Sequence, residues 1–62
     1  MTTRTYTVTA ELEFQGHYVR DVEWVITTDR PLDSHQAEAI TRFLYPNFVV
    51  GDIAISEPTF NQ

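Results

Sequence analysis

The stretch TYTVTAELEF, residues 5–14, alternates apolar and polar side chains without a break. Its even-numbered, apolar face carries Tyr6, Val8, Ala10, Leu12 and Phe14. Its odd-numbered face carries Thr5, Thr7, Thr9, Glu11 and Glu13. A period of two over this length predicts a β-strand at residues 3–14, with one face covered by a core and the other open to water.

A second alternating stretch, YVRDVEWVITT, predicts a strand at residues 18–28. Its apolar face also falls on even numbers, at Val22, Trp24 and Ile26. Directly paired residues share a face, so the numbers of each pair must add up to an even sum. A two-residue turn would give an odd sum. We therefore expect a three-residue turn at residues 15–17, with Gly16 in a left-handed conformation.

This turn sets the expected pairing of the two strands. It places Glu13 opposite His17. The two residue numbers of each pair then add up to 30, as for Val8 with Val22. A sum of 32 would place Glu11 opposite Asp21. Two like charges facing each other are unfavourable, so we expect the first register.

A helix is predicted at residues 34–45. Asp33 and Gln36 have the spacing of a capping box, and Pro46 stops the helix. The expected apolar stripe consists of Ile40, Phe43 and Leu44, flanked by Ala37 and Gln36. The residues expected to face water are Glu38, Thr41 and Arg42.

A third strand is predicted at residues 47–56, followed by a short tail at residues 57–62. The order is thus β-β-α-β. A right-handed crossover places the third strand beside the first. We expect one α+β domain over residues 1–62, with an antiparallel sheet of strand order 2-1-3 and the helix on its even-numbered face.

The third strand breaks the alternation seen in the first two. We expect Val49, Ile53 and Ile55 to face the helix, which leaves Phe48, Val50 and Ala54 on the open face. Gly51 can mark a bulge that changes the facing of one half of the strand. Two explanations stay open. Either the tail folds back and Phe60 covers Phe48 and Val50, or these residues form an apolar interface together with Val19 and Val25.

Composition narrows the function classes. The chain has 62 residues, a net charge of -5 and no cysteine, so disulfides cannot stabilise this small core. Its four basic residues are scattered arginines, which disfavours direct binding of nucleic acid. No stretch is long and apolar enough to span a membrane, and we expect no signal peptide, since the first ten residues lack an apolar segment. We expect a cytoplasmic protein that gains stability as a homo-oligomer, most simply a dimer.

No residue pattern indicates catalysis, a cofactor or a metal. His17 and His35 are expected at opposite ends of the second strand, too far apart to share a metal. Four carboxylates on the open face lie on a flat surface rather than in a cleft, which argues against an enzyme. We expect instead that they bind a protein partner with a basic surface; the four are Glu11, Glu13, Asp21 and Glu23.

Two alternatives remain beside this acidic interaction module. One is an accessory subunit that docks on a larger assembly through its third strand. The other is a ligand-binding or enzymatic unit whose pocket forms between protomers.

In length, acidity and expected β-β-α-β order, the chain is similar to small phage-encoded inhibitors such as anti-CRISPR proteins. This resemblance implies an inhibitor that occupies a partner's basic or nucleic-acid-binding groove.

Overall fold

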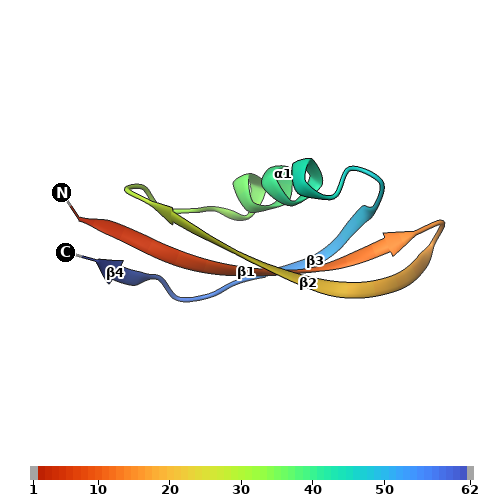
Figure 1. Ribbon diagram of the computed structural model, residues 1–62, viewed down its shortest axis with the longest axis horizontal. Helices are drawn as coiled ribbons and strands as arrows, with labels where there is room; N and C mark the ends of the chain where they lie inside the picture. The colour runs from red at the N-terminus through yellow and green to blue at the C-terminus, as the bar shows by residue number, and fades with distance from the viewer. Residues whose placement is uncertain (1, 62) are drawn as a thin grey trace.

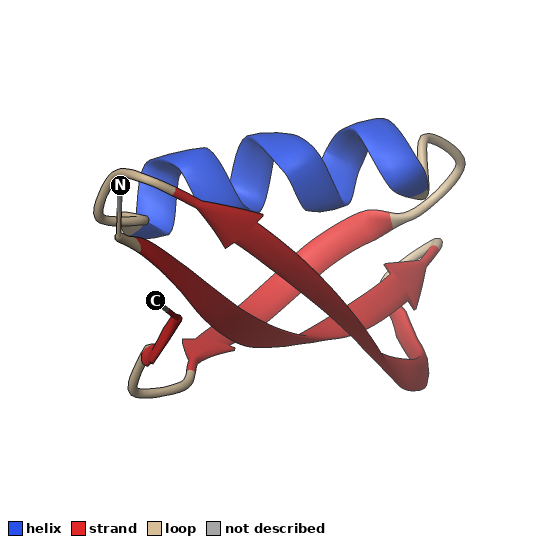
Figure 2. Ribbon diagram, turned by 60° about the vertical axis from the view of Figure 1, so that its left-hand side comes forward, coloured by secondary structure: helices blue, strands red, loops and turns tan. Residues whose placement is uncertain are grey.

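One helix lies on one face of a twisted antiparallel sheet (Figures 1 and 2). The computed structural model describes residues 2–61. Its elements, in chain order, are β1 (Thr3–Phe14), β2 (His17–Thr28), α1 (Ser34–Leu44), β3 (Val49–Ile55) and β4 (Thr59–Asn61). The predicted α+β fold is therefore confirmed, with a small fourth strand added.

The central strand is β1, which pairs with every other strand. The sheet order is β2-β1-β3, and β4 continues the β3 side along the first residues of β1. The predicted strand order is confirmed. The described ends of the chain lie together at one tip of an elongated molecule, and the β1–β2 turn lies at the other tip (Figure 1).

The turn between β1 and β2 differs from the prediction. It has two residues, Gln15 and Gly16, with φ angles of 53° and 80°, and Phe14 pairs directly with His17. Positive φ at both central residues is what a type I′ turn requires, and this turn matches the twist of the two strands. The three-residue turn that we expected is wrong.

A β-bulge in β2 makes the sum of the paired residue numbers even again. Glu13 pairs with Tyr18 but Leu12 pairs with Arg20, so Val19 is the extra residue. Beyond the bulge the pairs add up to 32, for example Ala10 with Val22. The predicted sum of 30 is wrong, because one inserted residue meets the parity requirement in another way.

The predicted capping of α1 is confirmed. The Asp33 carboxylate accepts a 2.8 Å hydrogen bond from the Gln36 N–H, and the Gln36 side chain accepts one from the Asp33 N–H. The helix ends at Leu44, one residue before the predicted end. Tyr45 is its C-cap residue.

Our prediction of which α1 residues pack against the sheet is partly wrong. Its buried residues are Ala37 and Thr41, whereas Phe43 is 84% exposed. The Thr41 hydroxyl donates to the Ala37 carbonyl and accepts a 2.9 Å hydrogen bond from Trp24 Nε1. These two small residues let the helix approach the sheet, and the indole N–H supplies a partner for the buried hydroxyl.

The bulge that Gly51 could mark, which the sequence left open, is present. Ala10 pairs with Ile53 but Leu12 pairs with Val50, so two residues of β3 stand opposite Glu11. Because of this switch, Val50 is buried in the core and Val49 is 60% exposed. Our prediction had these two facings the other way round.

Phe48 is also placed differently from the prediction. It precedes β3 and packs against the core beside Tyr45 and Ile53 rather than on the open face. Its ring lies edge-on to that of Phe14, with centroids 6.2 Å apart.

The tail forms β4 and does not cover Phe48 or Val50. Phe60 pairs with Arg4, whose guanidinium carbon lies 5.0 Å from the ring centroid. Phe48 and Val50 lie near the other end of β1, where Val50 pairs with Leu12.

The core is small. Its buried apolar residues are Tyr6, Val8, Ala10, Leu12, Val22, Ala37 and Val50. Four of the seven come from the even-numbered face of β1, as predicted from residues 5–14. The other face of the sheet, which carries the odd-numbered residues of β1, has no helix over it in the described part of the chain (Figure 1). We call it the open face.

Candidate interaction surface

The open face of the sheet carries a concentration of acids near the β1–β2 turn. Glu11 pairs directly with Asp21, and Glu23 stands opposite Thr9. Glu13 lies one step closer to the turn. The structure therefore brings together all four carboxylates that we had predicted to form an acidic face.

Asp52 adds a fifth carboxylate that the sequence analysis missed. Val50 and Ile53 pair with the core-facing residues Leu12 and Ala10, so the two residues between them, Gly51 and Asp52, both fall opposite Glu11 at the bulge and on its face of the sheet. A Cβ added at Gly51 would lie 2.8 Å from Oε2 of Glu13 and 3.3 Å from Cβ of Glu11. The absence of a side chain at Gly51 thus leaves room for both glutamates to lie across β3. We call Glu11, Glu13, Asp21, Glu23 and Asp52 the acidic face.

The acidic face has no internal counter-charge among residues 2–61. The ion pairs found there are Arg30 with Asp29 and Arg42 with Glu38, and both lie outside it. Five of the nine acidic residues of the chain are therefore gathered on one side of the sheet without an arginine partner. Like charges opposite one another destabilise a sheet, so this arrangement is not explained by folding alone.

Tyr18 belongs to the same surface. The two-residue turn places it opposite Glu13, directly before the bulge at Val19, and it is 60% exposed. Local desolvation and the nearby carboxylates of Asp21 and Glu11 raise the pKa of the Tyr18 hydroxyl. The sequence signal for this placement was Gln15-Gly16 read as a two-residue turn, which the parity argument had excluded.

Three apolar side chains accompany the acids on the open face. Val25 and Val49 are 61% and 60% exposed, and Ala54 pairs with Thr9. Val19 is exposed at the bulge of β2. Of the five apolar residues that we assigned to an interface, Phe48 and Val50 instead contribute to the core, and the other three remain accessible.

The half of the open face near the start of β1 carries threonines in place of acids, and their polar groups are hydrogen-bonded to neighbouring residues. Thr5 shares one of 3.0 Å with Thr27, and Asn61 Nδ2 donates one of 2.9 Å to Thr5 Oγ1. Ser56 Oγ accepts from the Thr7 N–H. These contacts join β1 to β2, β4 and the segment after β3. The acidic half is therefore the part of the open face with free charged groups.

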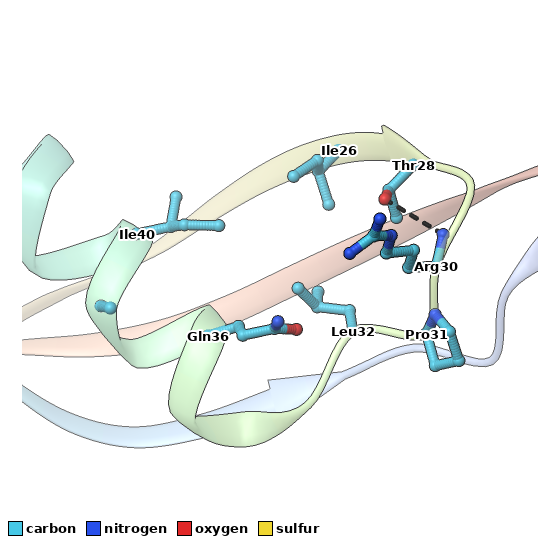
Figure 3. Close-up of a pocket in the computed structure, with 8 residues that line it drawn as sticks. Ile26, Thr28, Arg30, Pro31, Leu32, Gln36 and Ile40 are labelled. Atoms are coloured by element: carbon cyan, nitrogen blue, oxygen red, sulfur yellow. Dashed lines mark hydrogen bonds between the residues drawn. The ribbon is translucent and has the colours of Figure 1, made fainter.

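Another accessible feature of the described residues is a groove between α1 and β2, with a volume of about 330 Å³. Figure 3 shows its walls. Its lining residues are Ile26 and Thr28 of β2, Arg30, Pro31 and Leu32 of the connecting segment, and Gln36, Ala39 and Ile40 of α1. We call it the α1–β2 groove.

Two further kinds of feature are missing from residues 2–61. These residues contain no group of three or more histidine or acidic side chains arranged to hold a metal ion. They also contain no helix long and apolar enough to cross a membrane.

Comparison with known proteins adds no family. No family model matches the chain, and no curated protein or solved structure matches it significantly.

Proposed function

We propose that this protein is a small interaction module whose acidic face binds a basic surface of a partner protein. The observation that supports it most is the direct pairing of Glu11 with Asp21, with Glu13, Glu23 and Asp52 close by and no arginine among the described residues to neutralise them. A partner's lysines or arginines would remove this repulsion on binding.

The composition of the surface also favours a protein partner. Tyr18, Val25 and Val49 are each about 60% exposed and lie among or beside the carboxylates. Aromatic and aliphatic side chains surrounded by charge give a contact both burial and orientation. A basic groove that otherwise holds nucleic acid has the matching charge, so an inhibitor that competes with nucleic acid is the specific form of this proposal. A cytoplasmic location is part of it, since the chain contains no cysteine.

Docking through the outer edge of β3, our earlier alternative, has less support. Two of its three expected contact residues, Phe48 and Val50, pack in or against the core of this chain. A bulge at Gly51 also interrupts the strand.

Two variants with equal net charge test the acidic face. Glu11→Lys with Glu23→Lys reverses two charges on it, and Asp29→Lys with Glu57→Lys reverses two exposed charges elsewhere. Both change the net charge from -5 to -1, since each reversal adds two. The wild-type protein is used to capture partners from its native source, and the purified partner is then titrated calorimetrically with each variant at 50 and 500 mM NaCl.

We expect the acidic-face variant to bind at least tenfold more weakly at low salt, and the control variant to bind within about threefold of the wild type. Equal losses in the two variants would show that only net charge matters. Unchanged affinity of the acidic-face variant at both salt concentrations would rule out this surface.

A further inference from the structure

The two flanks of α1 differ in character. On one side of the buried residues Ala37 and Thr41 lie His35, Glu38 and Arg42, and Glu38 pairs with Arg42 at 3.2 Å. The side that borders the α1–β2 groove carries Gln36, Ala39, Ile40 and Phe43, and no charge. We call these four residues the uncharged flank. Its most prominent member, Phe43, is the most exposed large apolar side chain of the described residues, at 84%.

The flank remains open because of where the helix lies. The backbone of α1 comes closer to β3 than to β2. The apolar side chains between the helix and β2, Ile26 and Ile40 among them, therefore line a groove rather than a filled core (Figure 3).

The same side of the molecule has an unpaired strand edge. Ser56 takes both backbone groups of Thr7: it accepts from the Thr7 N–H and donates to the Thr7 carbonyl, each at 2.9 Å. These groups of Thr7 therefore point away from β2. Val25 is the partner of Thr7 in β2. In an antiparallel pair of this kind, the N–H and C=O of Val25 point to the outer edge.

The two edges of the sheet differ in protection. Short length, bulges, proline and lysine discourage pairing with another chain. On the β3 side, the strand has seven residues, contains a bulge and is followed by Pro58 before β4. On the β2 side, the strand has 12 residues with neither proline nor lysine, and beyond the bulge at Val19 it is regular to its end.

The molecule is also more extended than a compact monomer of its size. Its accessible surface is 4578 Å², whereas a compact monomeric protein of this mass exposes about 4,100 Å². Its radius of gyration is 12.6 Å, against about 11 Å for a compact chain of this length. A stable interface removes about 800 Å² from each partner, roughly a sixth of this surface.

We propose that the protein is a two-fold symmetric homodimer, joined by antiparallel pairing of its two β2 edges. The uncharged flanks of the two α1 helices face each other above the seam. A second copy fits because an edge strand is complementary to an identical strand under a two-fold axis. The flanks bring no like charges together. The pairing forms one six-stranded central sheet, with both helices on one face and both acidic faces on the other.

Sedimentation equilibrium of the purified protein over a wide concentration range tests the dimer. We expect the wild type to approach twice the 7.2 kDa chain mass as its concentration rises. Phe43→Ser removes an exposed side chain of the uncharged flank without touching the monomer core, and should raise the dissociation constant at least tenfold. Val49→Ser, a matched change at an exposed residue on the opposite face, should leave it within about twofold.

A second variant tests the strand pairing itself. Val25→Pro removes an outward N–H and leaves the β1–β2 hydrogen bonds in place, so a folded monomer is expected, with folding checked by circular dichroism. A wild type that stays monomeric at all concentrations would overturn the proposal. Greater weakening by Val49→Ser than by Phe43→Ser would also overturn it. This test involves no partner protein, so its failure is separate from failure of the proposed function.

Discussion

The indole N–H of Trp24 donates a 2.9 Å hydrogen bond to the hydroxyl of Thr41, which joins β2 to α1. The same hydroxyl donates to the Ala37 carbonyl at 2.7 Å. Thr41 is fully buried. A polar residue at the centre of the helix contact is thus satisfied on both sides, and it fixes how the helix is turned relative to the sheet.

Replacing this threonine tests that role. Thr41→Val keeps the shape but leaves the Trp24 N–H without its acceptor, so we expect a loss of about 1–2 kcal/mol in the free energy of unfolding. Urea denaturation followed by Trp24 fluorescence measures it. Thr41→Ser retains the hydroxyl and should lose less, with a fluorescence spectrum close to that of the wild type. Equal losses in the two variants would mean that the methyl group, not the hydrogen bond, is responsible.

The paired carboxylates of β1 and β2 should oppose folding. Because Glu11 faces Asp21 directly, Glu11→Gln is expected to stabilise the protein by about 0.5 kcal/mol at low salt. The gain should shrink in 0.5 M NaCl, since screening weakens the repulsion in the wild type. Chemical denaturation at the two salt concentrations measures both values. Glu57→Gln, at an exposed residue outside the acidic face, is the control and should change little.

The β1–β2 turn gives two changes of opposite sign. Gly16 has φ of 80°, so Gly16→Ala introduces a side chain in a left-handed conformation and should destabilise the protein by about 1 kcal/mol. Gln15 has φ of 53°, which asparagine tolerates better than glutamine. Gln15→Asn should therefore raise the thermal midpoint while Gly16→Ala lowers it. A three-residue turn, left-handed at Gly16 alone, would give no gain from Gln15→Asn.

Tyr18 should titrate at higher pH than a free tyrosine, because local desolvation and the carboxylates of Asp21 and Glu11 raise its pKa. Ultraviolet titration of the phenolate is complicated by the other two tyrosines, so the difference between wild type and Tyr18→Phe isolates it. Asp21→Asn should move the Tyr18 pKa back towards 10.

The sign of the stability effect follows from the raised pKa. The folded protein holds the Tyr18 proton more tightly than the unfolded chain, so this contribution is fully present below pH 10 and decreases as pH rises above it. Tyr18→Phe should therefore show a shallower loss of stability above pH 10. Identical slopes in the two proteins would contradict the assigned environment.

Alternation and capping predicted most of the fold. The even-numbered face of residues 5–14 supplies Tyr6, Val8, Ala10 and Leu12 to the core, and Asp33 caps the helix as expected. These features depend on neighbours close in sequence. The β1–β2 register was predicted from the rule that paired residue numbers have an even sum. Either a three-residue turn or a two-residue turn followed by one bulge satisfies this rule. Nothing in the local sequence decided between them.

The facing of α1 could not be predicted from hydrophobicity. Ile40, Phe43 and Leu44 form the more apolar stripe, but close approach of the backbone needs small residues, and Trp24 needs a hydrogen-bond acceptor. Ala37 and Thr41 meet both needs. The same limit explains Tyr18, whose place opposite Glu13 follows from the two-residue turn and not from any pattern of hydrophobicity.

The pairing of β4 with the first residues of β1 determines how this chain can reach its folded state. Asn61 donates to Thr3 and Thr5 across separations of 58 and 56 positions, and every strand needs β1 as its template. Most of the stabilising contacts therefore close long loops before they return any free energy. Despite its small size, we expect the chain to fold in milliseconds or slower rather than microseconds, with the β1–β2 hairpin forming first because its closing turn is the shortest.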